Sequence, residues 1–106
     1  MTEKLAEILH ELRQELESMY GDRLVQLVLY GSQARGDADA ESDIDVLVVL
    51  SGEFDYGAEI ERTSYISSAL SLKHDVVISC SFVPLERYNK ERTPFLLNVH
   101  REGILI

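Results

Sequence analysis

Gly31 and Ser32, followed by Asp43 and Asp45 after a ten-residue spacer, are the residues whose types and spacing could do chemistry. Glycine has no Cβ, so its backbone can approach a ligand closely, and the N–H groups of a helical turn starting there would face an anion. Two carboxylates one residue apart can share a divalent cation, and hard oxygen ligands suit Mg²⁺ or Mn²⁺. This combination predicts a nucleotidyl-transfer site that grips a triphosphate beside a metal ion.

Two short apolar runs must position these residues. Residues 24–30 are strand-like and stop at Gly31, and residues 44–50 are strand-like and follow Asp43. The period of two along a strand puts Asp43 and Asp45 on the same face. Because the glycine ends the first strand and the aspartates begin the second, only an antiparallel pairing brings them to one edge of the sheet.

Asp75 is a third candidate carboxylate. It opens the alternating run of residues 75–82, on the face that also carries Ser79 and Ser81. Residues 55–72 have the length of a helical crossover, which makes the second and third strands parallel. Asp75 is therefore expected to converge with Asp43 and Asp45 at one rim, although a single acid at a strand entrance is also common as a solvated side chain. The apolar residues of the crossover are Ile60, Ile66, Ala69 and Leu70.

Two amphipathic helices complete the predicted elements. Residues 2–20 have a helical apolar stripe, with Thr2 as the cap and Gly21 as the stop. A second helix begins at Pro94 and ends at Gly103, which leaves residues 104–106 as a short edge strand. The elements predict an α+β fold, a two-layer α/β arrangement with a small mixed sheet of three to four strands, in one domain over residues 1–106. The apolar stripe of the first helix consists of Leu5, Ile8, Leu9, Leu12, Leu16 and Met19, and that of the second includes Phe95, Leu96 and Val99.

Composition narrows the class of partner. The net charge of −9 argues against nonspecific nucleic-acid binding and favours a basic protein partner. The same charge repels a triphosphate, so a divalent cation has to neutralise both the aspartates and the phosphates. There is neither an apolar segment long enough for a bilayer nor a basic leader, so we expect a cytoplasmic protein without membrane contact. The single cysteine, Cys80, is expected in the core.

Three segments together resemble a known signature. They are Gly31-Ser32, Ala34-Arg35-Gly36 and Ser42-Asp43-Ile44-Asp45-Val46, and they are similar to the motifs of the minimal nucleotidyltransferases, relatives of the DNA polymerase β superfamily. The resemblance implies the nucleotidyltransferase fold, with ATP as substrate and two Mg²⁺ ions, or Mn²⁺, as cofactors. It implies metal binding and catalysis by Asp43, Asp45 and Asp75, and phosphate binding by Gly31 and Ser32. Arg35 either contacts phosphate or bonds the turn.

The resemblance also implies a partner. Short members of this family are antitoxins that pair with a helical HEPN ribonuclease toxin and add AMP to a toxin tyrosine, an analogy that rests on the family alone. A chain of 106 residues has no room for a second lobe, so a partner or a second subunit would complete the site, in a homodimer or a hetero-oligomer with the toxin. Two alternatives stay open: a non-catalytic antitoxin that masks the toxin by binding, and a transferase for a small molecule of the aminoglycoside type.

Overall fold

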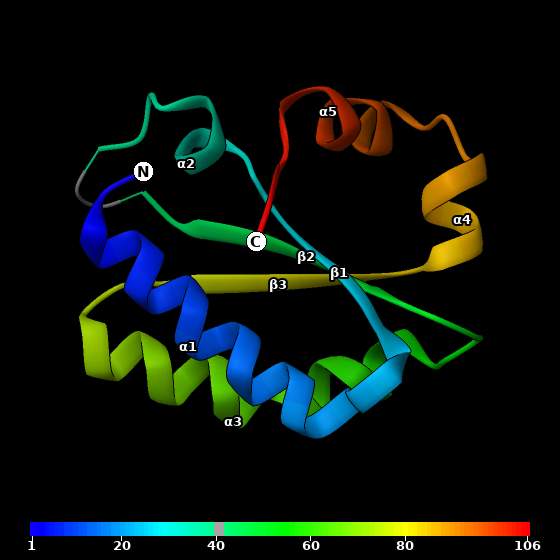
Figure 1. Ribbon diagram of the computed structural model, residues 1–106, viewed down its shortest axis with the longest axis horizontal. Helices are drawn as coiled ribbons and strands as arrows, with labels where there is room; N and C mark the ends of the chain where they lie inside the picture. Colours follow the sequence, from blue (N-terminus) through cyan, green and yellow to red (C-terminus); the bar gives the residue numbers. More distant parts are fainter. Residues whose placement is uncertain (40–41) are drawn as a thin grey trace.

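A four-stranded mixed sheet forms the centre of the computed structural model, which describes residues 1–39 and 42–106 (Figure 1). The strand order is β3-β2-β1-β4. β2 runs antiparallel to β1 and parallel to β3, and β4 is antiparallel to β1. The predicted mixed sheet and both predicted strand orientations are therefore confirmed. The strands are β1 (Leu24–Tyr30), β2 (Ile44–Leu50), β3 (Ile78–Pro84) and β4 (Ile104–Leu105).

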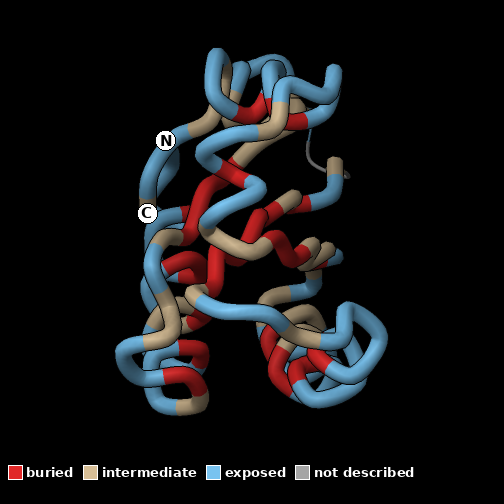
Figure 2. Tube along the Cα trace, turned by 90° about the vertical axis from the view of Figure 1, so that its right-hand side faces the viewer, coloured by how far each residue is buried: buried red, intermediate tan, exposed pale blue. Residues whose placement is uncertain are grey.

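Helices cover both faces of this sheet. α1 (Glu3–Tyr20) and α3 (Tyr56–His74) pack on one face, and α4 (Leu85–Lys90) and α5 (Pro94–Glu102) pack on the other. The single-turn helix α2 (Ser32–Arg35) lies at the end of β1, and a 3₁₀ turn, η1 (Gly21–Arg23), joins α1 to β1. Figure 2 shows the buried segments running between these two groups of helices. The structure therefore has a layer of helices on each face of the sheet, one layer more than the predicted two-layer arrangement. None of the helices in the described residues is long and apolar enough to cross a membrane.

α1 forms as its sequence predicts. The Thr2 hydroxyl accepts a hydrogen bond from the Leu5 N–H at 3.1 Å, and Gly21 ends the helix with a φ of 56°. Every residue of the predicted stripe from Leu5 to Leu16 is buried, while Met19 packs at the margin of the core. A regular stripe of this kind needs only one apolar partner surface, and the sheet supplies it.

The crossover helix α3 differs from the prediction in what it buries. Glu59 is only 5 % exposed, whereas the predicted core residue Ile60 is 36 % exposed. The Tyr20 hydroxyl donates to the Glu59 carboxylate at 2.6 Å, and Arg62 pairs with the same oxygen at 2.9 Å. A buried charge is tolerated when it is paired and hydrogen-bonded, so this contact between α1 and α3 takes the place that apolar packing was expected to fill.

The end of α3 also corrects the predicted start of the third strand. Asp75 has a left-handed backbone with φ 55° and ψ 52°, and the Val76 N–H donates to the Ser71 carbonyl at 3.0 Å, as in a Schellman cap. β3 begins only at Ile78. Asp75 therefore closes the helix rather than opening the strand, and the prediction of a strand over residues 75–82 is wrong at its first residues.

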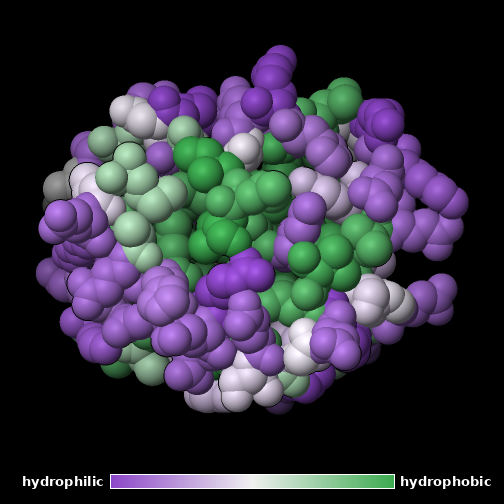
Figure 3. All heavy atoms as spheres, in the orientation of Figure 1, coloured by the Kyte–Doolittle hydropathy of each residue, from purple (hydrophilic) through white to green (hydrophobic). Residues whose placement is uncertain are grey.

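The C-terminal elements are confirmed, with one exposed exception. α5 begins at Pro94, and β4 pairs with β1 at the edge of the sheet. Leu96 and Val99 are buried, but Phe95 is 45 % exposed and so is not a core residue. Apolar side chains gather over the middle of the face drawn in Figure 3, where the C-terminal strand runs, and Leu105 is 64 % exposed. Cys80 is half-buried against the core between the sheet and α1 and α3.

Candidate active site

Gly31 and the Asp45 carboxylate meet at one edge of the sheet. The Cα of Tyr30 pairs with that of Asp45 across β1 and β2, which places the following glycine over the carboxylate. A Cβ built on Gly31 would lie 2.6 Å from Asp45 Oδ2, and the glycine has a φ of 75°, where L side chains are strained. The position therefore requires glycine for two reasons: its backbone conformation and the close approach of the Asp45 carboxylate. The predicted contact between turn and carboxylates is present for Asp45.

α2 presents its first N–H groups at this edge. The Gly31 carbonyl accepts from the N–H groups of Ala34 and Arg35, both at 3.1 Å, so the N–H groups of Ser32 and Gln33 precede the first bonds of the turn. The Gln33 side chain donates to the Ser42 carbonyl at 3.3 Å and so ties α2 to the residue before Asp43. The backbone donors at the start of α2 thus follow directly after Gly31, which approaches the Asp45 carboxylate of β2.

Asp43 and Asp45 form an electrostatically strained pair. Burial raises the pKa of Asp45, the neighbouring charge of Asp43 raises this pKa further, and Arg35 opposes the rise. Both effects act against the charged form of Asp45, and a bound cation would relieve both. Two oxygen-donor carboxylates in this position fit a hard divalent ion such as Mg²⁺ or Mn²⁺.

Arg35 lies at the site but is bound to acidic side chains. Its guanidinium donates to Asp37 at 3.2 Å and to Glu102, at the end of α5, at 3.5 Å. The hydrogen bond to Asp37 is the main reason why the pKa of Arg35 is raised. In this arrangement Arg35 links α2 to α5, which fits the interpretation that it stabilises the turn. A role in phosphate binding stays a prediction.

Asp75 is not brought to the carboxylate pair. It caps α3, and the β3 residue that pairs with Asp45 is Ser79. Across residues 1–39 and 42–106, no group of three histidine, cysteine, aspartate or glutamate side chains is arranged to hold one metal ion. The expected convergence of three aspartates is therefore absent, because the left-handed cap ends α3 before β3 begins. Whether Asp75 acts in catalysis stays a prediction from the sequence.

Tyr30 is a site residue that the sequence reasoning missed. Its hydroxyl lies 3.3 Å from the Ser81 hydroxyl of β3, so the side chain reaches across β2. Its ring meets that of Phe95 edge to face, with the centroids 5.3 Å apart. Burial raises the pKa of Tyr30, and the charge of Asp45 adds to the rise. Its place immediately before Gly31 was the available signal, since that position pairs with Asp45 once the strands are antiparallel.

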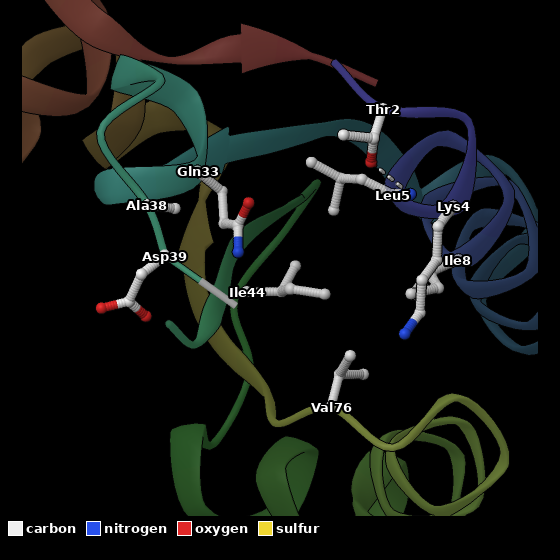
Figure 4. Close-up of a pocket in the computed structure, with 9 residues that line it drawn as sticks. All are labelled: Thr2, Lys4, Leu5, Ile8, Gln33, Ala38, Asp39, Ile44 and Val76. Atoms are coloured by element: carbon white, nitrogen blue, oxygen red, sulfur yellow. Dashed lines mark hydrogen bonds between the residues drawn. The ribbon is translucent and has the colours of Figure 1, made fainter. Parts of the chain in front are cut away.

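A cavity of about 370 Å³ lies on the other side of β2 (Figure 4). The capping residue Thr2 and the α1 residues Lys4 and Leu5 face Gln33 and Ile44 across it. Ile44 belongs to the core under α1 and α3, whereas its neighbour Asp45 points to the opposite face of the strand. The cavity therefore opens on the face away from Asp45, and we do not assign it to the triphosphate.

Two solved structures have the same fold. A toxin–antitoxin crystal structure with AMP-PNP matches 89 % of this chain and 68 % of its own, with a TM-score of 0.63 and 22 % identity. A tri-AMPylated Shewanella oneidensis HEPN toxin in complex with its MNT antitoxin matches 92 % and 70 %, with a TM-score of 0.53 and 18 % identity. At these identities the likeness concerns the fold alone.

The sequence comparisons identify the family. A protein of Methanocaldococcus jannaschii, named as a candidate protein adenylyltransferase, is 34 % identical over 101 residues, which cover 95 % of this chain and 97 % of the relative. The protein adenylyltransferase MntA of Thermococcus cleftensis is 32 % identical over 79 residues, which cover 74 % and 78 %. The model of the nucleotidyltransferase domain family matches residues 9–105. The chain with the Gly31 turn over the Asp45 carboxylate thus belongs to the nucleotidyltransferase family, among relatives that are named protein adenylyltransferases.

Proposed function

We propose that this chain is an antitoxin that transfers AMP from ATP to a hydroxyl group, that of a tyrosine, on a HEPN ribonuclease toxin. The observation that carries the proposal is the contact of the Gly31 turn with the Asp45 carboxylate, because it joins a phosphate-binding backbone to a cation-binding pair. The similar structures, a toxin–antitoxin complex with AMP-PNP and an AMPylated HEPN toxin with its antitoxin, support the choice of nucleotide and partner.

The reaction is an in-line displacement at the α-phosphate. The acceptor oxygen forms a bond to the α-phosphorus, the bond from that phosphorus to the bridging oxygen breaks, and pyrophosphate leaves. The hydroxyl proton passes to solvent or to a nearby carboxylate. The backbone N–H groups of Ser32 and Gln33 and the Ser32 hydroxyl, with the backbone at Gly31, would hold the outer phosphates and so fix the α-phosphate in place. Asp43 and Asp45 would hold Mg²⁺, which when bound neutralises phosphate charge and makes a coordinated hydroxyl more acidic.

The surface of the chain fits a protein acceptor. The net charge of −9 suits a basic partner, and apolar side chains are exposed at the β4 edge, where Leu105 is 64 % exposed. An acceptor protein would also supply the walls that two carboxylates and a turn cannot supply alone. We extend the proposal to a complex between this chain and the toxin, with ATP bound in the antitoxin.

One observation favours the masking alternative. Only two of the three predicted carboxylates meet in the described residues, so an antitoxin that binds without transferring AMP is the second candidate. The two candidates differ in whether protection of the cell depends on the carboxylate pair. A variant that lacks the Asp43 and Asp45 carboxylates but keeps the fold therefore distinguishes the two candidate functions.

The test combines the chain with ATP, Mg²⁺ and the HEPN protein encoded beside it, and measures the intact mass of the partner. We expect the mass of one or more AMP groups to be added, and this addition to disappear in the double variant Asp43→Asn, Asp45→Asn. The matched control is Asp22→Asn, Glu53→Gln, which removes the same charge from two exposed acids away from the pair. If the carboxylate variant binds the partner and still protects cells fully, masking is the function.

A further inference from the structure

A second cavity lies beside β3, the edge strand of the sheet next to β2. It has a volume of about 230 Å³, and its walls come from α3, β3, α4 and α5. Tyr56, Ser81, Arg87, Thr93 and Phe95 are the lining residues that matter here, and we call this cavity the aromatic cleft. Tyr56 and Phe82 line the cleft from the side of α3. Ser81 shares its face of β3 with Ser79, the residue that pairs with Asp45, so the part of the cleft between Ser81 and α5 lies on the same side of the sheet as the carboxylate.

Tyr30 joins the cleft to the carboxylate pair. It pairs with Asp45 at the end of β1, while its hydroxyl lies 3.3 Å from Ser81 and its ring packs against Phe95. Ser81 is two residues beyond Ser79, or about 7 Å along the strand. A group bound in the aromatic cleft would therefore lie one side chain away from a phosphate at Asp45. This spacing is of the size that separates the α-phosphate of a nucleotide from its base.

The lining of the cleft suits a flat, polarisable ring. Tyr56 contacts the core ring of Phe82 edge to face, and Phe95 contacts Tyr30 in the same way, but Phe95 is still 45 % exposed and Tyr56 49 % exposed, so both present free ring surface. Aromatic faces bind nucleobases by stacking, and the Arg87 guanidinium can add a cation–π contact. The hydroxyls of Ser81 and Thr93 supply hydrogen-bonding groups at the rim. The volume is below the range typical of pockets for drug-sized ligands, as suits one base rather than a whole nucleotide.

We propose that the aromatic cleft binds the purine base of the nucleoside triphosphate, whose phosphates lie at Gly31 and Asp45. This inference rests on the proposed function, because it takes the triphosphate position from that reaction. It adds a subsite that sets the base in place: Tyr56 and Phe95 provide stacking surface, and Tyr30 separates the base from the carboxylates. Base stacking would explain why the Phe95 ring is exposed, which core packing does not explain.

The chain contains no tryptophan, which allows a direct optical test. In the variant Phe95→Trp the only indole stands in the cleft, so stacking of a purine should quench its fluorescence. We expect quenching by Mg–ATP but not by Mg–tripolyphosphate, which has the phosphates without the base. The matched control is Leu97→Trp, on the same helix at a residue that is 47 % exposed and outside the cleft. The control should respond to neither ligand.

Calorimetry with truncated rings measures how much the subsite contributes. Phe95→Ala and Tyr56→Ala should each weaken Mg–ATP binding by about 5- to 150-fold, the effect of losing one base-stacking partner. Both variants should bind Mg–tripolyphosphate as tightly as the unmodified chain does. Tyr65→Ala, which removes a ring that is 61 % exposed on α3, is the control for Tyr56→Ala and should leave both affinities unchanged. Each titration is made with the chain alone and in its complex with the neighbouring HEPN protein.

The outcomes separate the two proposals. If Mg–ATP binds but neither ring truncation weakens it and Phe95→Trp is not quenched, the base lies elsewhere and the cleft proposal is overturned, while the proposed function stands. Quenching by the partner protein without ATP would show that a side chain of the acceptor fills the cleft, which also overturns it. If neither Mg–ATP nor Mg–tripolyphosphate binds to the chain or its complex, the proposed function fails and the subsite fails with it.

Discussion

Gly31→Ala is the substitution that tests the active-site geometry most directly. The backbone at Gly31 has φ 75° and ψ −156°, a region that only glycine occupies without strain. Forcing another residue into such a conformation costs about 1–3 kcal/mol of folding free energy. For a chain of this size each kcal/mol corresponds to about 4–8 °C in the melting temperature. The variant should therefore unfold earlier than the unmodified protein in urea and on heating.

The same substitution should damage the site more than the fold. The new Cβ would lie 2.6 Å from Asp45 Oδ2, against an ordinary contact of about 3.5 Å, so the carboxylate has to move by roughly 1 Å. A carboxylate at the end of a side chain can make this move, but it then no longer holds a cation in line with the phosphates. A misplacement of about 1 Å can reduce a reaction rate by about 100-fold. We expect AMP transfer to fall by about this factor.

Gly52→Ala is the matched control. Gly52 also has a positive φ, 79°, but a Cβ there meets no atom within 4 Å. It should lose about 1–2 kcal/mol of stability through backbone strain alone and keep its transfer rate. The assay follows AMP transfer to the HEPN partner by intact mass, and urea unfolding measures stability in parallel. Equal transfer rates in the two variants would refute the claim that Gly31 positions Asp45.

Four further predictions follow from the site and the core. Excess chelator should abolish AMP transfer, and transfer that persists would contradict a metal role for Asp43 and Asp45. Because the pKa of Asp45 is raised in the folded chain, its stabilising contribution is fully present below the usual pKa of 3.8 and is lost as pH rises through the higher folded value. Asp45→Asn should therefore be more stable than the unmodified chain near neutral pH, and urea unfolding at several pH values should show the difference vanish in acid. Asp75→Asn, which suits the left-handed cap, should leave calorimetric Mg–ATP binding unchanged, and a loss as large as that of Asp43→Asn would restore the three-carboxylate site. Tyr20→Phe should lower the free energy of unfolding by about 1.5–3 kcal/mol, because Glu59 loses a buried donor, with the exposed Tyr65→Phe as its neutral control.

The sequence carries enough information to place the centre of the sheet. The apolar run of residues 24–30 ends at Gly31, and the run of residues 44–50 begins beside Asp43 and Asp45. A phosphate-binding turn and a carboxylate pair must lie at one edge to share a ligand, and this requirement alone predicted the antiparallel orientation that the strands adopt. The crossover length fixed the parallel orientation of β2 and β3 in the same way. Both predictions depend on strand direction. Reversing β1 relative to β2 would move Gly31 to the opposite edge of the sheet from Asp45.

The position of Asp75 could not be read from the same pattern. Aspartate tolerates the left-handed conformation, so it can cap a helix where glycine is more usual. Alternation of apolar and polar residues over residues 75–82 continues through the cap and gives no sign that the first three residues lie outside the strand. The bond from the Val76 N–H to the Ser71 carbonyl decides the boundary, and it depends on the last turn of α3 rather than on the strand.

Exposure on the second face was equally hidden in the sequence. Phe95 has the spacing of a core residue of α5, but the short helix α4, which the sequence reasoning did not predict, lies against the same face. Tyr88 of α4 packs with Leu96 and Val99 and completes that core, which leaves Phe95 at the rim beside Tyr30. The cleft that we propose for the base thus lies where the apolar pattern predicts a buried ring and the packing leaves Phe95 exposed.

The charges of the site impose a link between nucleotide and metal. Burial and the charge of Asp43 both disfavour the ionised form of Asp45, in a chain whose net charge is −9. A triphosphate would add further negative charge to the same edge of the sheet. One divalent cation offsets both repulsions, between the two aspartates and between the aspartates and the phosphates. On the proposed function we therefore expect cation and nucleotide to bind cooperatively, and linkage requires each to strengthen the binding of the other by the same factor. Such a site would bind either ligand alone only weakly, and the bound cation would let an acidic chain bind ATP without a basic pocket.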